Sequence, residues 1–197
     1  MVGPVFIIGK DGPAHCLHGI AEADELLYMM ELEKGAWHLT CRARHHGAHA
    51  RTRGISNEQV CIQIAHDRTG QTLGFVTGKG ALTKAQLHTC LLPFIDSDVL
   101  MVTDGYAAYR TFSREADISH LSVNWRAGTR VQGAVQVTNV NSYQSRLRDR
   151  LRPFHGVDTR YLPNYLGRRR ILDAGRTRSP EPLLRATLGA FPNWTLA

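Results

Sequence analysis

The sequence lacks any hydrophobic run long enough to cross a bilayer, which takes about 20 apolar residues in a helix. It also lacks the basic stretch and the small-residue cleavage site that mark a secretory signal peptide, although its N-terminus contains a short apolar patch. These absences argue against an integral membrane protein and against a secreted one. We therefore expect a cytoplasmic protein without a membrane partner.

Cysteine is scarce, and its spacing excludes two common kinds of site. The chain has four cysteines, Cys16, Cys41, Cys61 and Cys90, and no two of them form a Cys-X-X-Cys pair. A zinc ribbon and a redox motif are therefore both unsupported, and the thiols are expected to be reduced and packed in or near a core. Internal repeats and low-complexity segments are also absent from the 197 residues, a length that fits one domain with its own core.

Acidic residues are few where arginine is most abundant. The net charge is +7, and only three aspartates lie among the arginines that follow residue 145. A basic excess is typical of proteins with an anionic partner, and the guanidinium group suits phosphate, so the pattern favours DNA. A position on the solvated surface would explain any one of these arginines, but it explains their clustering less well. The arginines assigned to DNA are Arg146, Arg148, Arg150, Arg152, Arg168, Arg169 and Arg170. A second basic stretch, 42–53, is either a solvated loop or a DNA-facing one.

The hydrophobic pattern predicts strands alternating with helices. The expected strands cover 19–24, 59–67, 72–78, 98–105 and 118–123. The expected helices cover 83–95, 106–116, a segment from about Asn139 to a break at Pro153, 158–172 and 179–191. The strands at 59–67 and 72–78 are separated by a short turn and predict a hairpin, whereas the later strand-helix-strand order predicts a crossover. Together they predict an α/β fold with a central mixed sheet flanked by helices.

Two aspartates are expected at the ends of strands. Asp24 closes the first expected strand, and Asp104 follows the most hydrophobic one. Ligand sites of open α/β sheets lie at the carboxyl ends of strands, so the two carboxylates would converge if their strands are neighbours. A hard cation such as Mg²⁺ would relieve their repulsion, and two such ions serve phosphoryl transfer. The simpler reading is a surface acid at Asp24 and a turn at Asp104-Gly105, and both readings stay open.

Several motifs occur in an order that resembles a known family. The segments "GIAEADELLYMMELEKG", "RGISNEQV", "VTDGYAAYRTF", "ISHLSVNW" and "VTNVNSYQSRLRDRLRPFHGVDTRYLPNYLGRRRIL" resemble the catalytic domain of ISXO-like insertion-sequence transposases. The similarity runs over 19–172. It implies a ribonuclease-H-like fold and DDE-type chemistry with two Mg²⁺ or Mn²⁺ ions. It also implies element-end and target DNA as partners, and a homo-oligomer in the transposition complex.

The resemblance assigns three residues to the metal site and to catalysis. By position, Asp24 matches the first acid of the family, Asp104 the second, and Asn141 the third. Many relatives have Glu at the third position, and a subgroup with "NVN" before an aromatic residue has Asn. An amide oxygen can bind a hard cation, but it brings no charge and cannot act as a general base. Weaker metal binding or altered chemistry is the expected consequence.

Other residues are assigned as auxiliary. His120 occupies a position where the family often has a histidine. Glu22 and Glu25 flank Asp24 and could each offer a spare carboxylate, and the alternation of a strand favours Glu22, on the same face as Asp24.

The resemblance also sets the expected domain organisation. We expect a leader over 1–18, a catalytic domain over 19–175 and a helical tail over 176–197. Family members generally carry a zinc ribbon and a helix-turn-helix segment before the catalytic domain, and neither has room in the first 18 residues. The expectation is a truncated or degenerate transposase, and the alternative is a non-catalytic DNA-binding relic with the same fold.

Overall fold

The computed structural model describes residues 16–29, 53–57, 59–123, 137–154, 157, 159–173, 180 and 184. The basic stretch 42–53 lies outside these residues except for Arg53. Residues 1–15 of the leader expected over 1–18, and nearly all of the expected last helix and tail, also lie outside them.

Five strands form one mixed sheet in the order β3-β2-β1-β4-β5. They are β1 (Ile20–Met29), β2 (Gln59–Asp67), β3 (Thr72–Lys79), β4 (Leu100–Thr103) and β5 (Ser119–Ser122). β1 pairs antiparallel with β2, and β2 pairs antiparallel with β3 across a short turn, whereas β4 runs parallel to β1 and β5 runs parallel to β4. The expected hairpin and the expected crossover are therefore both present.

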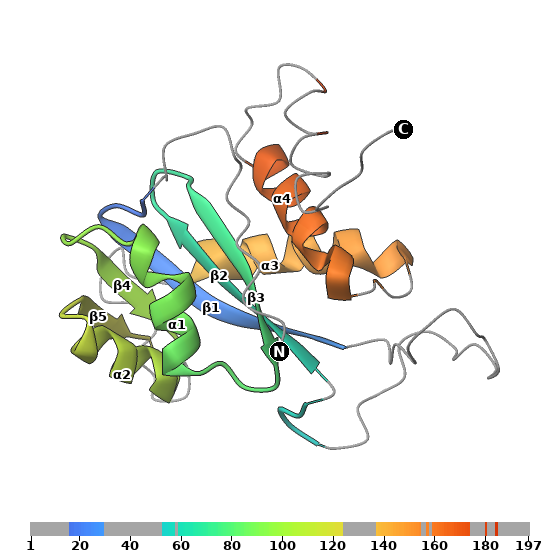
Figure 1. The fold of residues 1–197 in the computed structure, drawn as a ribbon. Helices are drawn as coiled ribbons and strands as arrows, with labels where there is room; N and C mark the ends of the chain where they lie inside the picture. Colours follow the sequence, from blue (N-terminus) through green and yellow to red (C-terminus); the bar gives the residue numbers. More distant parts are fainter. Residues whose placement is uncertain are drawn as a thin grey trace, which may run out of the picture.

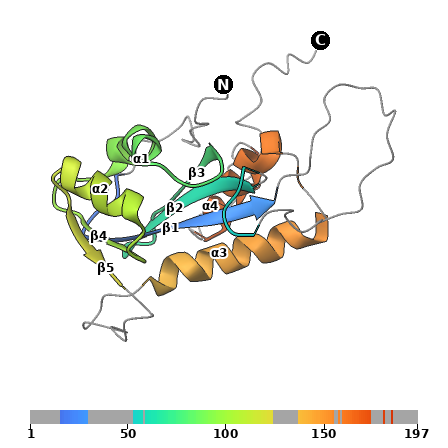
Figure 2. The same ribbon diagram turned by 90° about the horizontal axis from the view of Figure 1, so that it is seen from below.

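Helices cover both faces of this sheet (Figure 1). They are α1 (Lys84–Cys90), α2 (Ala107–Glu115), α3 (Thr138–Leu151) and α4 (Leu162–Asp173), with short 3₁₀ turns at Leu92–Phe94, Arg152–Phe154 and Thr159–Tyr161. Figure 2 shows α1 and α2 on one side of the sheet and α3 on the other. Helix α4 contacts β3 and α3. The ribonuclease-H-like α/β architecture, a central mixed sheet flanked by helices, is therefore confirmed.

The sheet separates two hydrophobic cores because alternate residues of a strand face opposite sides. On β2, Cys61 and Ala65 pack in the core under α1 and α2. Ile62 and Ile64 pack in the other core, with residues of α3 and α4 such as Leu147. This alternation means that neighbouring residues of β1 also face different helices, which decides how the acids of that strand are used.

The boundaries of β1 and β4 differ from the expectation. β1 does not end at Asp24 but runs to Met29, because its ladder with β2 continues from Ala21–Asp67 to Met29–Gln59. Asp24 therefore lies inside a strand and not at its end. β4 is shorter than expected, since it spans only Leu100–Thr103.

Proline explains two other boundaries. The helix expected over 83–95 begins after Thr83, which forms a capping box with Gln86, but its α-helical part ends at Cys90. Pro93 lies in the 3₁₀ turn that follows and has no N–H to continue the α-helical ladder. Pro163 lies in the first turn of α4, where a missing N–H costs nothing, so it marks a boundary and not a kink.

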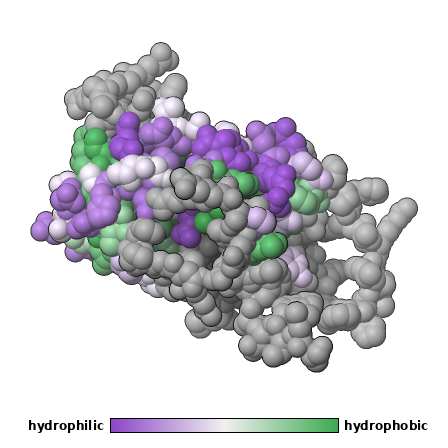
Figure 3. Space-filling view, turned by 90° about the horizontal axis from the view of Figure 1, so that it is seen from above, coloured by the Kyte–Doolittle hydropathy of each residue, from purple (hydrophilic) through white to green (hydrophobic). Residues whose placement is uncertain are grey.

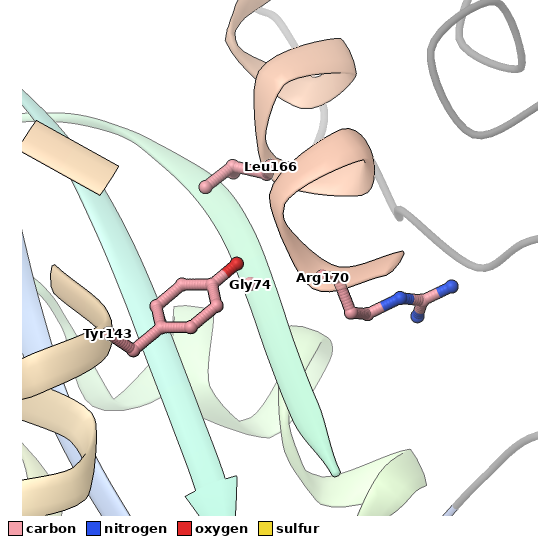
Figure 4. A pocket seen from close by; sticks show the side chains of 4 residues that line it. All are labelled: Gly74, Tyr143, Leu166 and Arg170. Carbon is pink, nitrogen blue, oxygen red and sulfur yellow. The ribbon is translucent and has the colours of Figure 1, made fainter. Parts of the chain in front are cut away.

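In the face shown in Figure 3, hydrophilic residues predominate, with hydrophobic residues between them. A small hollow between β3, α3 and α4 is lined by Gly74, Tyr143, Leu166 and Arg170, and Tyr143 points its hydroxyl toward Gly74 (Figure 4). Among the described residues, no helix combines the length and apolar character needed to span a membrane.

Candidate metal site at the end of the fourth strand

Because β4 ends early, no described strand pairs with β1 on that side beyond Glu22. The parallel ladder between the two strands runs from Ile20–Leu100 to Glu22–Val102. Asp24 lies two residues after Glu22 in β1, and Asp104 lies two residues after Val102, just past the end of β4. The two aspartates therefore lie side by side at this edge of the sheet. Asp104 accepts a hydrogen bond from the Tyr106 N–H at 3.0 Å, and the left-handed Gly105 (φ 88°) completes the turn.

Three carboxylates meet at this open edge. Oxygen atoms of Asp24, Glu25 and Asp104 all lie within 4.8 Å of one another. Asp24 belongs to the α3 face of β1 and Glu25 to the opposite face. On the β4 side no described strand pairs with either residue, so both side chains can reach that edge. Asp24 and Glu25 are half-buried, whereas Asp104 is exposed. The structure thus brings together the two aspartates that the sequence singled out, with a third acid beside them.

Burial and mutual repulsion make these carboxylates hard to ionise without a cation. Burial, followed by the nearby charge of Asp104, raises the pKa of Asp24 to about 6. Burial, followed by the charges of Asp24 and Asp104, raises the pKa of Glu25 to about 7. A cluster of this kind gains most from a divalent cation, which compensates all three charges at once.

Helix α3 faces the cluster through one side-chain stripe. The Gln144 side chain, which is buried, donates from Nε2 to Asp24 Oδ2 at 3.0 Å. One turn later, the charge of Arg148 lowers the pKa of Asp24. One turn earlier on the same stripe lies Asn141, which is exposed and whose side chain forms no hydrogen bond with the described residues. Gln144 therefore contacts an acid of the cluster directly, and the assignment of Asn141 stays a prediction.

Glu22 lies on the Asp24 face, as strand alternation predicted, but its carboxylate has a different partner. It is fully buried and accepts hydrogen bonds from the Asn139 N–H at 2.7 Å, the Val140 N–H at 3.0 Å and the Asn139 amide at 2.9 Å. Arg68 lies 3.2 Å away as its counter-charge. The expectation that Glu22 would be the spare carboxylate is corrected: it caps α3, and Glu25 joins the cluster. Sequence alternation could not indicate this, because it depends on where β4 stops.

His120 supports the turn that carries Asp104. Its Nε2 lies 2.9 Å from Thr103 Oγ1, and the same hydroxyl accepts a hydrogen bond from the Gly105 N–H. Burial, followed by the charge of Arg110, lowers the pKa of His120, so the ring is neutral at physiological pH. His120 thus does not contact Asp104 directly but acts on its turn through Thr103.

The predicted DNA-binding arginines occupy several environments. Arg146 and Arg169 both pair with Asp173, which joins α3 to α4. Arg148, Arg150 and Arg152 are exposed, and of these Arg152 pairs with Asp149 at 3.1 Å. The remaining two, Arg168 and Arg170, are half-buried on α4. The structure therefore separates arginines that hold helices together from arginines that are open to a ligand.

A second cluster of three residues lies before β1 and β4. Ligand atoms of His18, Asp96 and Asp98 also lie within 4.8 Å of one another, and His18 Nδ1 is 3.0 Å from Asp96 Oδ2. Its side chains are largely exposed, so water competes for each of them. The cluster at the end of β4 fits Mg²⁺ or Mn²⁺ better, because it offers carboxylate oxygens only, partly desolvated, and hard cations prefer oxygen ligands.

Comparison with known proteins identifies the family of the chain. The model of the ISXO2-like transposase domain family matches residues 17–169, more than half of the chain. No curated protein matches. Among solved structures, a chain of the "Crystal structure of a pre-cleavage Mos1 transpososome" aligns with 10% identity and a TM-score of 0.36. The alignment covers 90% of this chain and 57% of that one, so the present chain spans little more than half of its length.

Proposed function

The chain belongs to the ISXO2-like transposase domain family, and we propose that it is a DDE-type enzyme that cleaves and joins DNA strands with Mg²⁺ or Mn²⁺. The single observation that supports this activity is the convergence of Asp24, Glu25 and Asp104 at the open end of β4. Two of these acids are those that the family resemblance assigns to catalysis, although they are far apart in the sequence.

The proposed reaction consists of two displacements at phosphorus. In the first, a water oxygen forms a bond to the phosphorus at the element end, the P–O3′ bond breaks, and the strand leaves with a free 3′-hydroxyl. In the second, that hydroxyl attacks a phosphodiester of the target DNA, whose own P–O3′ bond breaks. Bound cations would stabilise the charge that develops on the attacking and leaving oxygens.

The protein residues have separate roles in this proposal. Asp24 and Asp104 would hold the cation, and Asn141 would add an amide oxygen from α3. Gln144 fixes one oxygen of Asp24 and thereby the direction of the other. His120, through Thr103, holds the turn of Asp104 in place. Arg148 and the other exposed arginines of α3 would bind the phosphate backbone.

The test is a cleavage and strand-transfer assay with the full chain, the ends of its own element, and Mg²⁺ or Mn²⁺. We expect nicked and joined products from the wild type, and their loss in Asp104→Asn. This variant can keep the hydrogen bond to Tyr106, so circular dichroism should show an intact fold. Equal product formation by the variant would sink the catalytic assignment.

A second candidate is a DNA-binding relic without chemistry. The observation in its favour is that the first turn of α3 has no acidic residue. This candidate predicts salt-sensitive DNA binding by the wild type, with no product under either cation.

A further inference from the structure

We infer that Glu25 is the third carboxylate ligand of the cation bound by Asp24 and Asp104, and that Gln63 and Tyr109 hold it in place. This inference rests on the proposed function, because it concerns the same metal site. It gives that site the negative charge that Asn141 cannot bring.

The first observation is the position of Glu25. It reaches the edge from the α1 and α2 side of β1, and its ligand oxygen lies within 4.8 Å of those of Asp24 and Asp104. Its other described neighbours leave it incompletely bonded, since the Oε2 atom is buried and has no hydrogen-bond partner among the described residues. A buried carboxylate oxygen in this state is rare in native proteins and calls for a ligand or a donor.

The second observation is a set of unpaired polar groups behind Glu25. Gln63 lies directly opposite Glu25 in the ladder of β1 and β2, and its side chain is fully buried. Both polar atoms of the Gln63 carboxamide lack a partner among the described residues. Directly opposite residues of an antiparallel pair face the same side with their Cβ atoms about 5 Å apart. Gln63 therefore has a donor within reach of Glu25.

The third observation comes from α2. Tyr109 is fully buried, and its hydroxyl also lacks a partner among the described residues. Burial, followed by the charges of Glu25 and Asp24, raises the pKa of Tyr109 well above its ordinary value, so its hydroxyl keeps its proton and remains a donor.

These groups fit one arrangement. A cation at the open edge takes one oxygen of Asp24, of Glu25 and of Asp104, while Tyr109 and Gln63 donate to the remaining oxygen of Glu25. Ligating carboxylates are usually held by such outer hydrogen bonds, which fix their direction. The three sequence segments involved, on β1, β2 and α2, meet only in the folded chain.

Mn²⁺ binding to the DNA-free full chain tests this inference without any reaction. Titration calorimetry would compare the wild type with Glu25→Gln, which removes only the charge, and with the matched control Glu115→Gln on the exposed end of α2. All proteins would carry Asp98→Asn, so that the cluster of His18, Asp96 and Asp98 does not contribute. We expect Glu25→Gln to lose at least about tenfold in affinity, and Glu115→Gln to bind as the wild type does.

Two outcomes would overturn the inference, and they differ in what they say of the proposed function. If Glu25→Gln keeps the affinity while Asp104→Asn loses it, Glu25 is not a ligand and the metal site of the proposed function stands. If the wild type itself binds no Mn²⁺, both the inference about Glu25 and the metal site of the proposed function are wrong.

A crystal of the wild type soaked in Mn²⁺ gives the answer even where Glu25→Gln does not fold. The anomalous peak is expected at about 2.2 Å from an oxygen of Glu25, in the range of hard-cation ligand distances. A Mn²⁺ ion held by Asp24 and Asp104 with Glu25 turned away would overturn the inference.

Discussion

At the scale of residues, Asp24 and Glu25 are half-buried before any cation binds. Asp24 and Glu25 are neighbours in the chain, yet they leave β1 on opposite faces and meet again only because β4 has ended. In the unfolded chain these carboxyls ionise near 3.8 and 4.5, whereas in the folded protein burial and mutual repulsion raise the pKa values to about 6 and about 7. The folded state therefore favours their protonated forms.

This shift predicts how stability depends on pH in the absence of metal. Between the unfolded and the folded pKa values the folded protein binds more protons than the unfolded chain, so its free energy of unfolding falls as pH rises from about 4 to about 7. Thermal unfolding in EDTA would measure it for the wild type and for Asp24→Asn. We expect the variant to gain stability relative to the wild type as pH rises, and saturating Mn²⁺ to restore the wild type at pH 7.5. A difference between the two proteins that does not change with pH would contradict the pKa values.

At the scale of elements, the position of α3 is set by a residue of another element. Its N-cap residue, Val137, offers no side-chain hydrogen bond, and its first turn has no acidic residue. The free N–H groups at that end are instead bound by Glu22 of β1, two residues before Asp24. A carboxylate at a helix N-terminus also interacts favourably with the helix dipole. The same strand thus carries the acid of the site and the acid that places the helix facing it.

Loss of this cap is expected to be costly. Glu22→Ala leaves buried N–H groups of Asn139 and Val140 unpaired and removes the counter-charge of Arg68, so we expect a loss of about 3 kcal/mol in the free energy of unfolding. Urea unfolding would measure it, and amide hydrogen exchange at Asn139 and Val140 should accelerate. The matched change Glu115→Ala removes only an exposed, water-screened ion pair with Lys84 and is expected to change the free energy of unfolding far less than Glu22→Ala does. Equal effects of the two changes would show that Glu22 does not hold α3.

The elements were largely predictable from the sequence, but the site was predictable only in part. Strands such as β2 follow from a run of residues that favour strands, and α1 follows from Thr83 as its N-cap. β1 was expected to stop at Asp24 because acids interrupt its apolar pattern, whereas pairing with β2 carries it to Met29. The contact of Gln144 with Asp24 and the place of Glu25 depend on the relative positions of α3, β1 and β4. A local pattern contains no such information.

At the scale of the whole molecule, the charge of +7 is the feature that a DNA partner would recognise first. The described arginines divide into two groups. Arg146 and Arg169 are tied to Asp173 between α3 and α4, although Arg146 is exposed, whereas Arg148 and Arg150 are exposed on α3 and form no ion pair with a described residue. Arg148 and Arg150 can therefore exchange water for phosphate without giving up an ion pair that links α3 to α4.

This division predicts different effects on DNA binding. Arg148→Ala and Arg150→Ala are each expected to reduce the slope of log affinity against log salt by about 1, because each removes one phosphate contact. Arg169→Ala is expected to lower the thermal unfolding temperature while leaving the slope nearly unchanged. Fluorescence anisotropy of a labelled duplex over a salt series would measure the slopes. A reduced slope in Arg169→Ala alone would place the DNA on α4 and contradict this division.

The central claim, that Asp104 acts by holding the catalytic cation, is tested most directly by exchanging the metal and its ligand together. Asp104→Cys replaces a hard oxygen ligand with a thiolate, which Mn²⁺ accepts more readily than Mg²⁺ does. Strand transfer from element ends would be measured for this variant and for the wild type with each cation. The account predicts that the wild type works with both cations, and that Asp104→Cys is inactive with Mg²⁺ and regains activity with Mn²⁺. Full activity of Asp104→Cys with Mg²⁺ would contradict it, because the oxygen ligand would then be dispensable.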